Sequence, residues 1–245
     1  MNKKISILLA LIITLLIYLS YLHLNNTSLP REKAIVGRVI DGDTLVLNDG
    51  RTIRLLNINS PEKSTPLSQE STSLVKLLEN ETIEMEITGK DIYNRYLSRI
   101  YTPEYLNLKL VSLGLASKFL VQDSELKLFA NAEKEAIEKS RGIWNKSIYL
   151  NCFSSTIDQK KEKVTIKNLC PPINISGWVL KDESRKEYKF NTILNNQITL
   201  YSTIGTDNNN ILHWNSKTNV WNDDRDSLYL FDSNNNLAHY NFYGY

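Results

Sequence analysis

An Asn-Asp-Gly turn at residues 48–50 is the feature that most restricts how this chain can fold. Asp-Gly supplies the left-handed backbone positions of a tight hairpin, and extended runs flank it at residues 45–47 and 51–58. Another run, at residues 34–40, leads into Asp-Gly-Asp-Thr at residues 41–44, which is typical of a second tight turn. The sequence therefore predicts three short strands that pair antiparallel in succession.

Two further strands and three helices follow. The strands are predicted at residues 82–88 and 96–101, and the helices at residues 66–79, 106–113 and 124–140. Leu74, Val75, Leu77 and Leu78 form the predicted buried face of the first helix. This element order predicts a five-stranded OB-fold barrel with three helices, which we place at residues 34–150. Both enzymes and passive binding proteins use that fold, so it does not decide function.

The composition changes after Trp144. Residues 151–163 are polar and are predicted to form a loop. The rest of the chain is rich in Asn, with short apolar runs such as residues 197–201 and 227–232 between turn clusters. Short strands at close spacing predict an all-β, immunoglobulin-like sandwich over residues 151–245. The fold class is therefore mainly β with α.

The N-terminus carries an almost entirely apolar stretch at residues 5–24, long enough to cross the hydrocarbon core of a membrane. Lys3 and Lys4 precede it and favour a cytoplasmic N-terminus. We expect residues 1–24 to be a transmembrane anchor and residues 25–33 a linker, with the rest of the chain outside the cytoplasm. A signal peptide that is cleaved to release a secreted protein is the alternative.

The compartment in which the chain resides decides whether its two cysteines form a disulfide. Cys152 and Cys170 are eighteen positions apart, and outside the cytoplasm such a pair predicts a disulfide. Two unpaired thiols in a cytoplasmic chain are the alternative. Two cysteines alone cannot form a zinc site. The net charge of +2 is too small to indicate a nucleic-acid partner, so any such case depends on where particular arginines lie.

Three polar clusters, at residues 41–44, 54–62 and 91–95, fall at the ends of predicted barrel strands. Together they contain the groups that phosphodiester hydrolysis needs. Negative charge builds up on the phosphate oxygens in the transition state, and a divalent cation and two guanidinium groups can neutralise it. Arginine binds phosphate through two parallel hydrogen bonds, and a carboxylate can orient or deprotonate the attacking water. Calcium accepts several oxygen ligands from adjacent loops.

Residues 34–144 resemble the staphylococcal nuclease (thermonuclease) family. The resemblance is carried by Asp-Gly-Asp-Thr at residues 41–44, Arg-Leu-Leu at 54–56, Ser-Pro-Glu at 60–62, Tyr-x-Arg at 93–95, Gly-Leu-Ala at 114–116 and Gly-Ile-Trp at 142–144. It implies a calcium-dependent endonuclease that hydrolyses DNA and RNA and leaves 3′-phosphate products.

The resemblance also implies roles for individual residues. Asp43, Asn59 and the Ser60 carbonyl would bind Ca²⁺. Arg54 and Arg95 would bind the scissile phosphate, Glu62 would orient or deprotonate the water, and Tyr93 would contact a substrate phosphate. Two features depart from the family pattern. Asn59 stands where an aspartate is usual, and residues 117–122 lack the tyrosines that pack against a nucleotide.

The segments at residues 164–168, 175–182 and 220–232 resemble the lamin-tail domain, which implies a binding or positioning module whose partner the sequence does not identify. Two other interpretations stay open. The chain could be a non-catalytic OB-fold nucleic-acid-binding protein, or an envelope adhesion protein that acts through its sandwich. The joint presence of Asp43, Arg54, Glu62 and Arg95 favours the enzyme.

Overall fold

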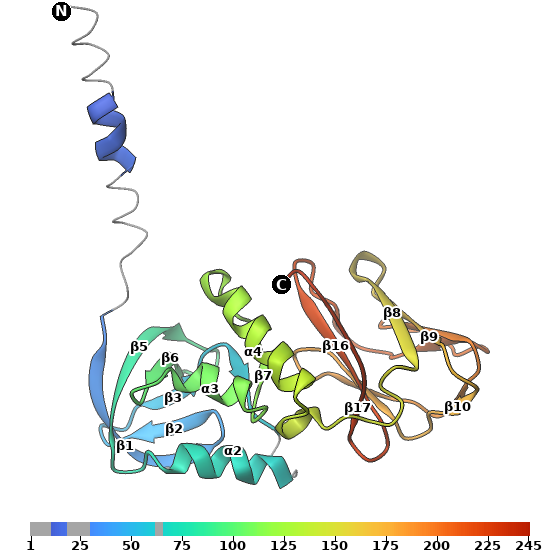
Figure 1. The fold of residues 1–245 in the computed structure, drawn as a ribbon, viewed down its shortest axis with the longest axis horizontal. Coiled ribbons are helices and arrows are strands. Elements are labelled where there is room, and N and C mark those ends of the chain that lie inside the picture. Colours follow the sequence, from blue (N-terminus) through green and yellow to red (C-terminus); the bar gives the residue numbers. More distant parts are fainter. Residues whose placement is uncertain (1–10, 19–29, 62–65) are drawn as a thin grey trace, which may run out of the picture.

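The computed structural model describes residues 11–18, 30–61 and 66–245 (Figure 1). Residues 11–18 are helical, and the remainder of the predicted anchor at residues 1–24 lies outside the described residues. Within the described part of the chain, we find no helix whose length and apolar character would let it cross a membrane.

Five strands close into a barrel in the order β1-β2-β3-β6-β5 (Figure 1). They are β1 (Glu32–Asp41), β2 (Thr44–Leu47), β3 (Thr52–Leu55), β5 (Thr82–Lys90) and β6 (Tyr96–Tyr101). β3 and β6 are parallel, and the other neighbours are antiparallel. Inward-facing side chains such as Val36, Leu45, Ile53, Met85 and Ile100 are fully buried and form the core. The predicted OB-like barrel is therefore confirmed.

Residues 30–61 and 66–150 form the described barrel region, and three α-helices belong to it. They are α2 (Pro66–Lys76), α3 (Leu106–Ser112) and α4 (Leu126–Glu138), and α4 is preceded by the 3₁₀ turn η1 (Asp123–Glu125). The prediction that the first helix runs to residue 79 is wrong. The chain leaves the helix after Lys76, where Leu77 N–H bonds the Leu74 carbonyl, so Leu77 is 73% exposed and not in the buried face.

A close contact between two glycines anchors the end of the barrel region. Gly114 and Gly142 both have positive φ, and a Cβ on Gly114 would lie 2.2 Å from the Arg141 carbonyl oxygen. Ile143 N–H donates to the Gly114 carbonyl (2.9 Å), which fixes the 3₁₀ turn η2 (Gly142–Trp144) against the end of α3. Only glycine allows this approach, because any side chain would collide with the backbone opposite.

The third strand is shorter than predicted, and its early end shapes the site. The prediction of one strand over residues 51–58 is wrong, because Asn57 adopts a left-handed conformation with φ 68°. Asparagine tolerates that conformation better than most residues. The chain then forms β4 (Ile58–Asn59), which leaves the barrel sheet and pairs with β7 (Ser117–Lys118). Residues after Leu55 are thereby carried out of the barrel wall.

The C-terminal region, residues 151–245, is β-rich and contains several sheets. One sheet has the order β15-β14-β9-β8 and another the order β12-β11-β16-β17, and both contribute to one core. Their strands are β8 (Phe153–Asp158), β9 (Lys163–Asn168), β11 (Val179–Lys181), β12 (Glu187–Lys189), β14 (Gln197–Tyr201), β15 (Ile211–His213), β16 (Asp226–Phe231) and β17 (Leu237–Tyr243). A small pair, β10 (Ile173–Asn174) with β13 (Ile193–Leu194), and the 3₁₀ turn η3 (Gln159–Lys161) complete the region.

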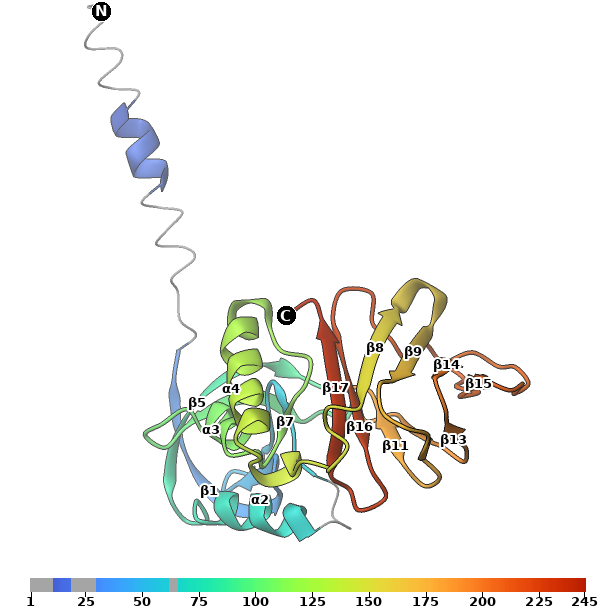
Figure 2. The same cartoon turned by 45° about the vertical axis from the view of Figure 1, so that its right-hand side comes forward.

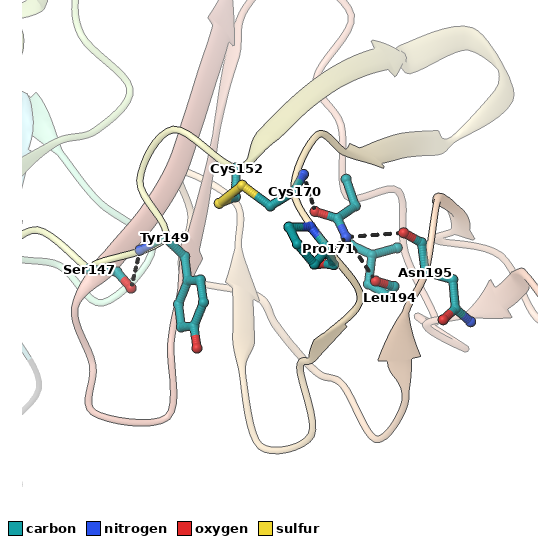
Figure 3. Close-up of a disulfide and its surroundings, with 8 residues drawn as sticks. Ser147, Tyr149, Cys152, Cys170, Pro171, Leu194 and Asn195 are labelled. Atoms are coloured by element: carbon teal, nitrogen blue, oxygen red, sulfur yellow. Dashed lines mark hydrogen bonds between the residues drawn. A yellow bond between two sulfur atoms is a disulfide. The ribbon is translucent and has the colours of Figure 1, made fainter.

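The prediction of a loop over residues 151–163 is wrong, because residues 153–158 form β8, which pairs antiparallel with β9 along its whole length. A disulfide joins Cys152, just before β8, to Cys170, just after β9 (Figure 3), with the two Cα atoms 5.2 Å apart. Leu169 N–H also donates to the Cys152 carbonyl (2.8 Å), so the ends of this hairpin are held covalently and by hydrogen bonds.

The two regions share an apolar core, and α4 lies beside the sheet of β16 and β17 (Figures 1 and 2). The Trp144 ring packs against Tyr229 and Phe231, with ring centres 5.0 and 6.4 Å apart. Ile137 and Leu237 belong to the same buried cluster. The barrel and the C-terminal region are therefore joined by a packed interface.

A buried polar network lies in the same interface. Lys118 is only 2% exposed, and its ammonium group contacts carboxylates from both regions, Glu133 at 2.9 Å and Glu183 at 3.5 Å. It also contacts the hydroxyls of Ser227 and Tyr229. Because Lys118 lies on β7, the network is attached directly to the strand that pairs with β4.

Candidate active site

The Asp-Gly-Asp turn between β1 and β2 places Asp43 in a buried polar pocket. Asp43 accepts hydrogen bonds from the Ser60 backbone N–H (2.6 Å) and the Thr44 hydroxyl (3.0 Å), and Arg54 lies 3.4 Å away. Burial alone would raise the pKa of Asp43, but the charge of Arg54 and these hydrogen bonds outweigh it, so the pKa lies below its usual value. Asp43 is therefore held as a carboxylate.

Gly42 is required where this turn meets α2. A Cβ at Gly42 would lie 2.0 Å from the Ser71 hydroxyl and 2.8 Å from Cβ of Ser60. The turn is thus packed closely between the helix and the segment that follows β4. That packing brings Asp43 within hydrogen-bonding distance of the Ser60 backbone.

Arg54 extends from β3 into the same pocket and is 8% exposed. Its guanidinium group donates to the Leu55 carbonyl (2.8 Å) and to Oδ1 of Asn59 (2.6 Å). Burial lowers the pKa of Arg54, the charge of Asp43 opposes that effect, and the positive charges of Arg95 and Arg185 lower it further. Arg54 is thus a rigidly held cation with two other guanidinium groups nearby.

The structure places Asn59 beside Arg54, so its amide oxygen is a hydrogen-bond acceptor for the guanidinium group. β4 fixes this position, because Asn59 pairs with Ser117 of β7. The predicted site residues Asp43, Arg54, Asn59 and Ser60 are therefore brought together at one end of the barrel.

Arg95 and Tyr93 come from the loop between β5 and β6. Asp91 organises this loop by accepting hydrogen bonds from the backbone N–H groups of Tyr93 and Arg95 and from Nε of Arg95 (2.7 Å). Arg95 precedes β6, which pairs with β3, so its charge acts on Arg54. Tyr93 is 73% exposed, and its ring centre lies 5.5 Å from the guanidinium carbon of Arg95. Glu62 lies outside the described residues.

Two residues of the site were not among the predicted ones. Asp41 accepts a hydrogen bond from Asp43 N–H (3.2 Å), and burial followed by the charge of Asp43 raises its pKa. The Asp-x-Asp spacing across a turn was a signal for this pair. The second residue is Arg185, from the turn between β11 and β12. Arg185 is far from the barrel residues in the sequence, so no sequence motif indicated that it belongs to the site.

A cleft between the two regions borders this site. Its volume is about 340 Å³. The barrel contributes Asn59, Ser60, Pro61 and Ser117 to its lining, and the C-terminal region contributes Lys181, Asp182, Glu183 and Arg185. The candidate site therefore opens into a cleft with walls from both regions.

The donor set of the site fits a hard cation. Asp41 and Asp43 are neighbouring carboxylates whose mutual repulsion a divalent ion would relieve. Within residues 11–18, 30–61 and 66–245, we find no group of three or more His, Cys, Asp or Glu side chains arranged for a metal.

Comparisons with known proteins agree with this geometry. A family model described as "Staphylococcal nuclease homologue" matches residues 52–146. The chain is 33% identical over 137 residues to a thermonuclease of Staphylococcus intermedius, which covers 50% of this chain and 82% of that protein. It is 32% identical over 116 residues to an uncharacterized endonuclease of Escherichia coli, covering 45% of this chain and 75% of the relative. This chain belongs to the staphylococcal nuclease family, and its barrel is a staphylococcal nuclease-like endonuclease domain.

Proposed function

We propose that this chain is a calcium-dependent nuclease that hydrolyses phosphodiester bonds of DNA and RNA outside the cytoplasm and leaves 3′-phosphate ends. The observation that carries the proposal is the arrangement around Arg54. A buried guanidinium group is fixed by Asp43 and Asn59, and a second arginine is close enough to alter its pKa. Two neighbouring guanidinium groups suit a phosphate group that gains charge in the transition state.

Each residue has a proposed role. Arg54 and Arg95 hold the scissile phosphate and neutralise its developing charge. Asp41, Asp43, Asn59 and the Ser60 carbonyl would hold Ca²⁺, which would supply Lewis-acid stabilisation of the same charge. Glu62 follows Ser60 by two positions and would orient or deprotonate the water. Tyr93 contacts a neighbouring substrate phosphate.

We also propose an extracytoplasmic location, with the apolar stretch at residues 5–24 as a membrane anchor and signal cleavage as the alternative. The disulfide between Cys152 and Cys170 supports export, because disulfides persist in oxidising compartments. The C-terminal region is proposed to be a lamin-tail-like module, because residues 164–168, 175–182 and 220–232 resemble that domain.

The test is a cleavage assay on the fragment of residues 29–245, with single-stranded DNA and RNA. We expect cleavage with Ca²⁺, loss of cleavage in EGTA, much weaker cleavage with Mg²⁺, and products whose ends carry phosphatase-sensitive 3′-phosphates. Arg54→Lys should abolish most activity, whereas Arg38→Lys, the same change at an exposed position of β1, should not. Full activity in EGTA would contradict the proposal.

A non-catalytic nucleic-acid-binding barrel is the second candidate, and Asn59 favours it. An amide in place of a carboxylate removes one negative charge from the cation site. That candidate predicts nucleic-acid binding that is equal with Ca²⁺ and with EGTA, and no cleavage in either.

A further inference from the structure

The turn between β11 and β12 projects Arg185 into the cleft beside the active site. Asp182 organises this turn by accepting hydrogen bonds from Lys186 N–H and the Ser184 hydroxyl, both at 2.6 Å. Arg185 itself has a φ of 70°, a left-handed conformation that costs free energy for a long side chain. Such backbone outliers are concentrated at functional sites, where the surrounding structure maintains them.

Glu183, two positions before Arg185, fixes this turn to the barrel. Glu183 is buried and accepts a hydrogen bond from the Leu120 backbone N–H (3.1 Å), and it forms an ion pair with Lys118 (3.5 Å). Within its own region it accepts from the Ser227 hydroxyl (3.0 Å). Arg185 therefore has a defined position relative to the barrel, as a substrate-binding residue requires.

Arg185 lines the same cleft as two of the candidate site residues, Asn59 and Ser60. Asn59 is hydrogen-bonded to Arg54. The positive charge of Arg185 also acts on Arg54, as the charge of Arg95 does. Arg54 is paired with Asp43 and Arg95 with Asp91, and three guanidinium groups in one region still attract a polyanion.

The acidic residues of the cleft do not oppose an anionic ligand strongly. Glu187 is paired with Lys181 (2.5 Å), and Glu183 is paired with Lys118. Asp182 is buried and accepts the hydrogen bonds that close its own turn. Glu183 and Glu187 are thus paired with cations, and Asp182 is held by hydrogen bonds within its turn.

From these observations we infer that Arg185 binds a backbone phosphate of the nucleic-acid strand next to the scissile phosphate. The C-terminal region then forms one wall of the substrate groove of the nuclease. This inference rests on the proposed function and deepens it, because it assigns substrate binding to a residue outside the matched family segment of residues 52–146.

Binding without cleavage gives the direct test. The fragment of residues 29–245 is titrated in EGTA against a fluorescein-labelled oligothymidylate of roughly 16 nucleotides, at several salt concentrations. Arg185→Asn and Arg185→Gly remove the guanidinium group with residues that accept a positive φ. Lys167→Gln, which removes an exposed lysine on β9 of the other sheet, is the matched control for lost charge.

We expect both Arg185 variants to bind about tenfold more weakly at low salt, with the slope of log K against log salt reduced by about 0.7, the value for one lost phosphate contact on a single strand. Arg185→Lys should keep the wild-type slope. Wild-type affinity and slope in both the Asn and the Gly variants, with Lys167→Gln also unchanged, would overturn the inference.

A cleavage assay with Ca²⁺ separates this inference from the proposed function. If wild-type protein cleaves, the Arg185 variants should show a KM raised about tenfold with kcat little changed, as loss of a contact away from the reacting phosphate predicts. If wild-type protein does not cleave but the Arg185 variants lose affinity and slope, the proposed hydrolysis fails and the inference that Arg185 contacts phosphate stands.

Discussion

Replacing Lys118 with Met should cost a large part of the stability of this protein. At an effective dielectric of 20, the contacts of Lys118 with Glu133 at 2.9 Å and Glu183 at 3.5 Å correspond to gross attractions of about 6 and about 5 kcal/mol. Desolvation of the three charges offsets most of that attraction. Removing one member of a buried ion pair nevertheless costs about 3–5 kcal/mol, because the remaining carboxylates lose their countercharge. We expect that loss for Lys118→Met.

The loss should depend on pH in a defined direction. Burial raises the pKa of Glu183 and the charge of Lys118 opposes this, so removing Lys118 should raise the pKa further. A carboxyl group whose pKa is higher in the folded state stabilises the fold below its unfolded pKa, about 4.3, and loses that contribution as pH rises through the folded pKa. The destabilisation caused by Lys118→Met should therefore be smaller at pH 5 than at pH 8.

Urea denaturation at both pH values measures the effect. Lys134→Met is the matched control, because Lys134 forms a largely exposed ion pair with Glu138 on α4, and such pairs contribute about 0–1 kcal/mol. The reasoning is refuted if Lys118→Met costs less than about 1 kcal/mol, or if its cost is the same at pH 5 and pH 8.

Three further predictions concern the site and the disulfide. Arg54→Lys and Arg95→Lys should each lower kcat by two or more orders of magnitude, which corresponds to about 3 kcal/mol of transition-state stabilisation. Steady-state rates near wild type would show that the planar guanidinium group, with its two parallel hydrogen bonds, is not needed. Asn59→Asp should lower the half-saturating Ca²⁺ concentration several-fold to about a hundredfold in cleavage assays, because it adds a charge beside Asp43. An unchanged value would place residue 59 outside the cation site. Replacing Cys152 and Cys170 together by Ser should lower the free energy of unfolding by roughly 3 kcal/mol in urea titrations, and no change would mean that the bond does not restrict the unfolded chain.

Local sequence signals predicted most of the barrel. The strand predicted at residues 96–101 is β6 with the observed bounds, and the Asp-Gly turns led correctly into β2 and β3. The errors come where local preference competes with longer-range packing. Residues 56–58 have strand-forming character, but Asn57 accepts hydrogen bonds from Gln122 and Phe119 N–H, so the strand ends there. Similarly, β8 forms because β9 is available to pair with it.

The candidate site could be predicted only in part, for the same reason. Asp43, Arg54 and Ser60 fall within neighbouring motifs of a short segment, so the family resemblance indicated them together, and Asn59 was indicated by its place just before Ser60. The contact between Arg54 and Asn59 depends on the left-handed turn at Asn57, which no pattern indicated. Arg185 reaches the cleft because the whole C-terminal region docks on α4 and β7, and that arrangement is a property of the folded molecule.

The packing of Trp144 has a consequence for cooperativity. Trp144 lies inside the segment that matches the family, yet the rings that cover it belong to β16, much later in the chain. Without that sheet, the end of the barrel would expose a tryptophan, an isoleucine and a buried lysine to water. The segment that matches the family is therefore shorter than the part of the chain that folds as one unit. Calorimetry should show a single melting transition for the barrel and the C-terminal region, with a calorimetric enthalpy close to the van't Hoff value.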